Sequence, residues 1–138
     1  MKKYIIVFLM LILMTGCSKG NSLKCTSTEV VSENTYKNEI KFTFKDDKVS
    51  KAKLTMDVIL GEAGMKNYDL YYNAFEQTFA GLNDEEGVKV ELKKNDKGYK
   101  VIIDADYSKY KGQLDMINSS LNKDQTKVYY ENIKYECK

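Results

Sequence analysis

Alternating apolar and polar residues run through the chain between residues 25 and 60. In the segment 36–45, Ile40, Phe42 and Phe44 point to one side, and the lysines and the threonine between them point to the other. This period of two residues is typical of a strand with one buried face. The pattern predicts strands over 25–33, 36–45 and 50–60, with turns at Asn34 and at Asp46-Asp47.

After Gly61 the apolar residues recur at steps of three and four instead. They are Tyr68, Tyr71 or Tyr72, Phe75, Phe79 and Leu82. This spacing predicts an amphipathic helix that ends near Gly81 or Asn83. Two further strands are expected from Gly87 to Ala105, joined by a hairpin loop over 95–98 whose glycine suits a positive φ.

Helical spacing returns in the last third of the chain. Tyr110, Leu114, Ile117 and Leu121 predict a second helix over 110–121. From Asp124 we expect a short helix through Ile133, followed by an extended end that brings Cys137 back to Cys25. Each predicted strand has one apolar and one charged face, so the sheet should be antiparallel, with helices on one side and water on the other. The sequence thus predicts an α+β fold with an antiparallel sheet of about five to six strands and two to three helices packed on one face.

The N-terminus has the pattern of a bacterial lipoprotein signal. Met1-Lys2-Lys3 is followed by an apolar stretch from Tyr4 to Met14, and Thr15-Gly16 precede Cys17. The apolar stretch is shorter than the roughly 20 residues that a membrane span requires, and its length matches the core of a signal peptide. We therefore expect a signal peptide over 1–16, a palmitate-bearing Cys17 at the start of a polar tether over 17–24, and a single domain over 25–138. This places the protein on the extracytoplasmic face of the cell membrane, anchored in the envelope by lipid.

The amino-acid composition limits the functions that can be expected of this chain. Lys2 and Lys3 lie in the signal, so the mature chain has 20 lysines and 20 acidic residues and is close to neutral, which gives no reason to expect nucleic-acid binding. The chain has no histidine, the usual acid–base group near neutral pH and the commonest transition-metal ligand. We expect no cofactor, no bound metal and no enzymatic activity.

Two cysteines remain once Cys17 is assigned to lipid. Cys25 and Cys137 lie at opposite ends of the domain, and an even number of cysteines outside the cytoplasm is typical of a disulfide. A pair of free thiols or a redox couple is the alternative, although redox pairs usually lie close together in sequence, as in Cys-x-x-Cys. We predict a structural Cys25–Cys137 disulfide that closes nearly the whole domain into one loop.

Tyrosine is the other conspicuous component. Tyr68, Tyr71 and Tyr72 cannot all face the sheet from one helix, so at least one should line a rim or groove near Phe75. Tyrosine clusters are common at binding surfaces because the ring is apolar and its tip is polar. The alternative is a core built from tyrosine because the chain has no tryptophan. We predict a non-enzymatic binding surface at these four residues, for an unknown protein or small-molecule ligand.

A second hypothesis is a small envelope hydrolase that uses a carboxylate pair such as Asp104 and Asp106. It requires a cleft in which one carboxyl pKa is raised. A third possibility is a purely structural surface protein with no tight ligand.

Several segments together resemble a known family. They are Met14-Thr15-Gly16-Cys17, the early Cys25, the block Phe42 to Lys51 and the tail Tyr135-Glu136-Cys137-Lys138. In these segments the chain is similar to small bacterial surface lipoproteins of the YehR-like type. The resemblance implies a compact α+β domain tethered outside the membrane, and it implies no catalytic residues.

Overall fold

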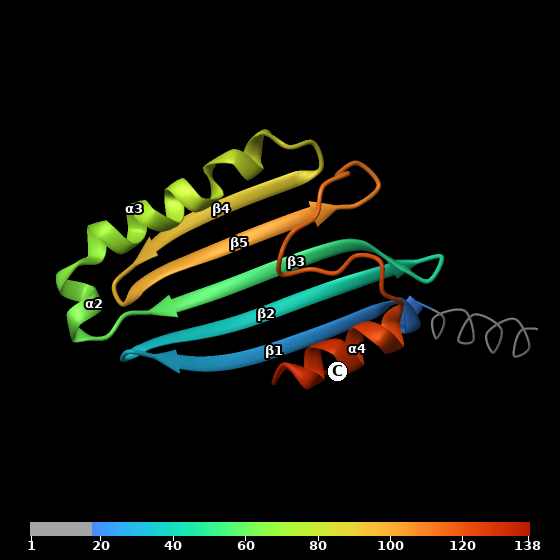
Figure 1. Ribbon diagram of the computed structural model, residues 1–138, viewed down its shortest axis with the longest axis horizontal. Helices are drawn as coiled ribbons and strands as arrows, with labels where there is room; N and C mark the ends of the chain where they lie inside the picture. Colours follow the sequence, from blue (N-terminus) through green and yellow to red (C-terminus); the bar gives the residue numbers. More distant parts are fainter. Residues whose placement is uncertain (1–17) are drawn as a thin grey trace, which may run out of the picture.

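A twisted antiparallel sheet with helices along one face makes up the computed structural model, which describes residues 18–138 (Figure 1). The strands are β1 (Ser22–Val31), β2 (Asn34–Lys45), β3 (Lys48–Ile59), β4 (Val88–Asn95), β5 (Gly98–Asp106) and β6 (Glu136–Cys137). The helices are α2 (Glu62–Lys66), α3 (Tyr68–Phe79) and α4 (Lys123–Asn132), with 3-10 turns η1 (Ser18–Asn21) and η2 (Ala80–Asp84). The predicted α+β fold is confirmed. Between residues 18 and 138, none of the helices is both long enough and apolar enough to cross a membrane.

The strands lie in the order β4-β5-β3-β2-β1-β6, and every neighbouring pair is antiparallel. After β3 the chain runs through α3 to the far edge of the sheet, where β4 forms, and β5 then returns to pair with β3 (Figure 1). At the other edge β6 pairs with β1, so the end of the chain lies beside its first strand.

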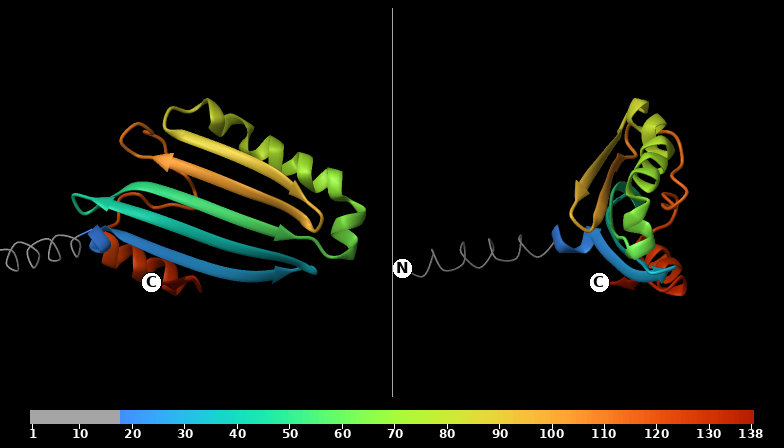
Figure 2. Two further views of the ribbon diagram at one scale, coloured as in Figure 1. Left: turned by 180° about the vertical axis from the view of Figure 1, so that it is seen from behind. Right: turned by 90° about the vertical axis from the view of Figure 1, so that its left-hand side faces the viewer.

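The two faces of the sheet differ in character because the side chains alternate along every strand. The face under the helices, which we call the inner face, carries the core; among its residues are Leu23, Ile40, Phe42, Leu54, Val58, Tyr99, Val101 and Ile103, all buried. The opposite, outer face carries mostly lysine, threonine and acidic side chains, and none of the helices within residues 18–138 covers it (Figure 2). This division matches the predicted arrangement of helices on one side and water on the other.

The two longer helices pack over different parts of the inner face. In α3 the side chains Tyr68, Tyr72, Phe75 and Phe79 recur at helical spacing and are half-buried against the core. In α4 the buried residues are Thr126 and Tyr130. Asn122 caps this helix, because its side chain accepts the Gln125 backbone N–H at 2.9 Å while the Gln125 side chain accepts the Asn122 N–H at 3.2 Å. The helix predicted from Asp124 is thereby confirmed.

The first strand and the first turn differ from the prediction in position. β1 begins at Ser22 rather than Cys25, because the pairing with β2 extends to Ser22 opposite Thr43. The turn lies at Ser32 and Glu33, both with positive φ, and Asn34 is already in β2. Asn34 is buried and its side-chain oxygen accepts the Gly61 N–H at 2.9 Å, so this residue holds the start of α2 instead of forming the turn.

The helix predicted over 110–121 is wrong. This segment is an irregular loop that crosses the inner face, and its one bridge joins Leu114 to Ile117 (Figure 1). Two side-chain turns compete with helical bonding: Asp106 accepts the Ser108 N–H at 3.0 Å, and Asn118 accepts the Ser120 N–H at 3.2 Å. The apolar spacing that resembled a helix instead places Tyr110, Leu114 and Ile117 on the sheet, where all three are buried.

The hairpin between β4 and β5 lies where the sequence predicts it. Gly98 has a φ of 156°, and a Cβ at this position would overlap the Val58 carbonyl oxygen of the neighbouring strand. Only glycine permits this approach of the two backbones.

Candidate functional site

The predicted tyrosine surface on α3 is divided between the core and the solvent. Tyr68, Tyr72 and Phe75 face the sheet and are half-buried. The centres of the Phe75 and Tyr99 rings are 4.8 Å apart, and the Tyr72 ring meets the Tyr99 ring edge-on with their centres 6.3 Å apart. Tyr71 points away and is 37% exposed. Three of the four predicted residues therefore contribute to packing, and the predicted binding surface narrows to the rim around Tyr71.

Two polar contacts fix the orientation of these rings. The Tyr68 hydroxyl donates to the Gly98 carbonyl at 2.6 Å, and the Lys94 ammonium lies 4.3 Å from the centre of the Tyr72 ring. A cation over an aromatic face is attracted by the negative charge of that face. These contacts connect α3 to the hairpin between β4 and β5, so Tyr68 and Tyr72 have a structural role.

A cleft of about 380 Å³ opens beyond this cluster, between the end of α3 and the loop over 113–117. Its floor includes Leu54 and Ile103, each 1% exposed. Its walls include Phe79, Leu82, Leu114, Met116 and Ile117, with Thr78, Gln113 and Asp115 as polar groups. A mostly apolar cleft of this size with a few polar groups is typical of a small-ligand site.

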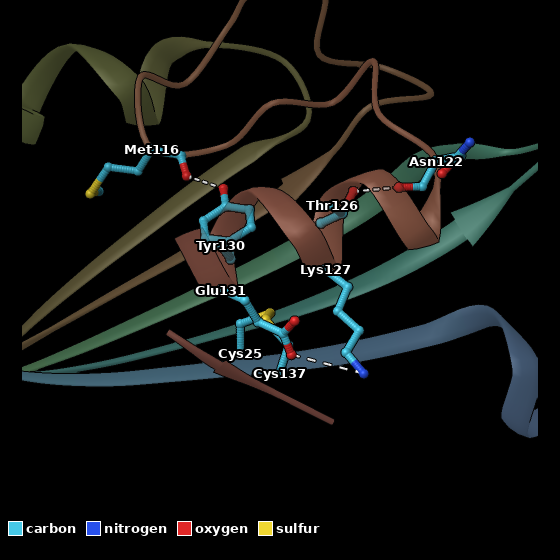
Figure 3. The surroundings of a disulfide bond; sticks show 8 residues. All are labelled: Cys25, Met116, Asn122, Thr126, Lys127, Tyr130, Glu131 and Cys137. Atoms are coloured by element: carbon cyan, nitrogen blue, oxygen red, sulfur yellow. Dashed lines mark hydrogen bonds and ion pairs between the residues drawn. A yellow bond between two sulfur atoms is a disulfide. The ribbon is translucent and has the colours of Figure 1, made fainter. Parts of the chain in front are cut away.

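Contacts with α4 hold the loop wall of this cleft. Tyr130, 2% exposed, donates its hydroxyl proton to the Met116 carbonyl at 2.5 Å (Figure 3). Burial raises the pKa of Tyr130, so the hydroxyl keeps its proton and acts as a donor. Ile117 donates its N–H to the Leu114 carbonyl at 2.9 Å, which closes a tight turn at the cleft. The wall is thus held by a buried bond from a helix more than ten residues later in sequence.

The sequence did not reveal this cleft. The apolar residues of its walls have the spacing of two amphipathic helices, and this spacing predicts that they pack in the core. One feature of the sequence does indicate a loop in this segment: the short cluster Asn118-Ser119-Ser120 favours a loop over a helix.

The predicted Cys25–Cys137 disulfide is confirmed. The two residues are directly opposite in the β1–β6 pairing, with Cα atoms 4.1 Å apart, and Lys24 and Lys138 exchange two backbone hydrogen bonds beside them at 2.8 and 2.9 Å. Both cysteines are buried beneath α4, next to Tyr130 (Figure 3). Cys17, the predicted lipidation site, lies outside the described residues.

The carboxylate pair lies on the outer face. Asp104 is 3.9 Å from the Lys53 ammonium. Asp106 accepts the Ser108 hydroxyl at 2.6 Å and its N–H at 3.0 Å, and these bonds lower the pKa of the Asp106 carboxyl. A general acid would need the opposite shift. Over residues 18–138, no three His, Cys, Asp or Glu side chains converge in a way that could hold a metal ion.

These features define an α+β protein with an antiparallel sheet, closed by one disulfide and bearing an apolar cleft on its helix-covered side. No protein-family model, no curated protein and no solved structure matches this chain. The resemblance to YehR-like lipoproteins therefore remains a prediction from the sequence.

Proposed function

We propose that this protein is a lipid-anchored, extracytoplasmic protein of the bacterial envelope that binds a ligand without catalysing a reaction. The observation that carries the proposal is the Cys25–Cys137 disulfide. Disulfides persist in oxidising compartments outside the cytoplasm and are rare inside it. The signal-like sequence over 1–17 supplies the route to that compartment.

The start of the domain supports an anchor at Cys17. η1 begins at Ser18 and β1 at Ser22, so the folded domain follows Cys17 directly. Lys123 donates its ammonium proton to the Gly20 carbonyl at 2.8 Å, which holds η1 against the start of α4. A lipid on Cys17 would therefore keep the whole domain close to the membrane.

We propose the cleft between α3 and the 113–117 loop as the binding site. Its polar groups, Thr78, Gln113 and Asp115, include no nucleophile paired with a base. Its other lining residues are apolar and suit a small apolar ligand or an apolar side chain of a partner protein. Binding is thus the function that this lining supports best.

Metabolic labelling with a palmitate analogue tests the anchor. We expect label on the wild-type chain and none on Cys17→Ser, with the wild type recovered in the membrane fraction. Mass spectrometry without reductant tests the compartment, because the Cys25–Cys137 bond should leave no thiol there to alkylate. An unlabelled wild-type chain, or two alkylatable thiols, would contradict the proposal.

An apolar fluorescent dye, anilinonaphthalene sulfonate, tests the cleft. Thr78→Trp places a large ring at the cleft wall and should abolish dye binding. Gln77→Trp is the matched control, because Gln77 is exposed on the same helix and does not line the cleft. Equal dye binding by the two folded variants would exclude the cleft as the apolar site.

A further inference from the structure

The outer face of the sheet is unusually rich in lysine. The register places ten lysines and six acidic residues on it: Lys24, Lys37, Lys41, Lys45, Lys48, Lys51, Lys53, Lys89, Lys93 and Lys100, with Glu39, Asp57, Glu91, Asp104, Asp106 and Glu136. The mature chain as a whole has equal numbers of lysines and acidic residues. The excess of four positive charges is therefore specific to this face and is balanced elsewhere on the domain.

Strand pairing brings like charges together on this face. Lys24, Lys41 and Lys53 are direct neighbours across β1, β2 and β3. Like charges directly opposite each other destabilise a sheet, so this row does not serve the stability of the fold. Glu39 offsets part of the repulsion, since its carboxylate lies 2.8 Å from the Lys24 ammonium and 3.2 Å from that of Lys41.

Other lysines on the face are left without such a partner. Among residues 18–138, Lys37, Lys45 and Lys51 form no ion pair. Lys51 also lines a shallow depression of about 360 Å³ with Lys41 and Lys53. The face is thus an exposed cationic surface about five strands wide.

The chain enters the domain at the end of the sheet where β1 begins, beside the first residue of α4. Figure 2 shows η1 on the side of the sheet away from α3. Cys17 is three residues before Gly20, and three residues span at most about 10 Å. An anchor at Cys17 would hold this side near the lipid headgroups, within about one Debye length at physiological ionic strength.

We infer that the outer face lies against an anionic lipid surface, with its lysines facing the headgroups. The inference rests on the lipid anchor of the proposed function, and charge complementarity selects the occupant: a basic patch beside one lipid anchor is attracted to anionic lipids. The helix-covered face, with its apolar cleft, then points away from the membrane toward a ligand or partner.

The absence of tryptophan from the chain makes a clean test possible. The lipidated mature protein is reconstituted into vesicles of phosphatidylcholine, with or without brominated phosphatidylglycerol. Thr43→Trp places the reporter on the outer face, and Gln77→Trp places the control on α3. We expect bromine to quench the fluorescence of the outer-face reporter several-fold more than that of the α3 reporter. High salt should abolish this difference, because it screens the attraction between the lysines and the anionic lipid. Equal quenching of the two reporters would overturn the inference.

Charge variants then identify the surface. Lys41→Gln/Lys51→Gln/Lys53→Gln should remove the quenching of the outer-face reporter. Lys66→Gln/Lys127→Gln/Lys134→Gln lowers the net charge equally away from this face and should leave quenching unchanged. Loss of quenching in both triple variants would show a general charge effect and would overturn the inference.

Failure of the anchor and failure of the orientation can be told apart. If palmitate labelling fails and the protein does not float with neutral vesicles, the anchor is wrong. Quenching of the outer-face reporter by brominated anionic vesicles then still tests whether the lysine face binds anionic lipid. If the protein floats with neutral vesicles but the two reporters do not differ, the anchor stands and the orientation is wrong. Binding of soluble polyphosphate without any quenching by brominated lipid would likewise overturn the membrane assignment.

Discussion

Reduction of the Cys25–Cys137 disulfide should cost the domain much of its stability. The two cysteines are 112 residues apart, so the bond closes almost the whole domain into one loop. In the chain-entropy treatment a loop of this length lowers the entropy of the unfolded chain by an amount equivalent to about 4.8 kcal/mol at 25 °C. The total stability of a domain is typically about 5–15 kcal/mol. Loss of this bond therefore removes a third or more of it.

Urea unfolding of the mature protein, followed by far-UV circular dichroism with and without a phosphine reductant, measures this contribution. With an m-value of about 2 kcal/mol/M, the midpoint should fall by about 2 M on reduction. Cys25→Ala/Cys137→Ala is the control for direct effects of the reductant, because its midpoint should not respond to it.

Two results would refute the reasoning. If the oxidised and reduced chains unfold at the same urea concentration, loop closure contributes nothing measurable. If the double variant shifts with reductant as much as the wild type does, the effect does not arise from this bond.

Three further substitutions or titrations test other parts of the structure. Tyr130→Phe should destabilise the domain by about 1–2 kcal/mol, because it removes the buried bond to the Met116 carbonyl; Tyr129→Phe, which loses no such bond, should change the urea midpoint little. Asp47→Gly should raise the free energy of unfolding by up to about 1 kcal/mol, because the φ of 58° at Asp47 is left-handed and costs a residue with a Cβ about 1–2 kcal/mol, while the greater freedom of glycine in the unfolded chain offsets about 0.4–1 kcal/mol of this gain; a lower urea midpoint would contradict this. Burial raises the pKa of Tyr107 to about 12, so its contribution to stability is complete below pH 10 and is lost as the pH rises to about 12; tyrosinate absorbance should show Tyr107 and Tyr130 ionising only together with unfolding, and ionisation of all tyrosines in the folded state would contradict this.

The sequence was sufficient to predict those parts of the fold that are determined by neighbouring residues. The alternation of Ile40, Phe42 and Phe44 is enough to orient β2, because side chains on a strand must point alternately to its two faces. The hairpin at Gly98 was predictable because its backbone conformation requires glycine. The disulfide followed from the number of cysteines left for the domain.

Long-range arrangement was not predictable in the same way. The loop over 110–121 has helical apolar spacing, but its side-chain turns and its contact with Tyr130 determine its path. The cleft joins residues 78–82 to residues 113–117, and no local pattern connects them. The row of Lys24, Lys41 and Lys53 depends on the register of three strands, which alternation alone leaves open.

The two proposed surfaces lie on opposite faces of the same strands, and this separation has a consequence. On β5, Ile103 forms part of the cleft floor while Asp104 points to the lysine face. Because neighbouring side chains on a strand point in opposite directions, a substitution on one surface need not disturb the other. The domain can therefore lie on anionic lipid through its outer face while the cleft on its inner face stays open to a ligand. If the outer-face lysine variant changed dye binding in the cleft as strongly as Thr78→Trp does, the two surfaces would be coupled through the sheet, and this division of roles would be wrong.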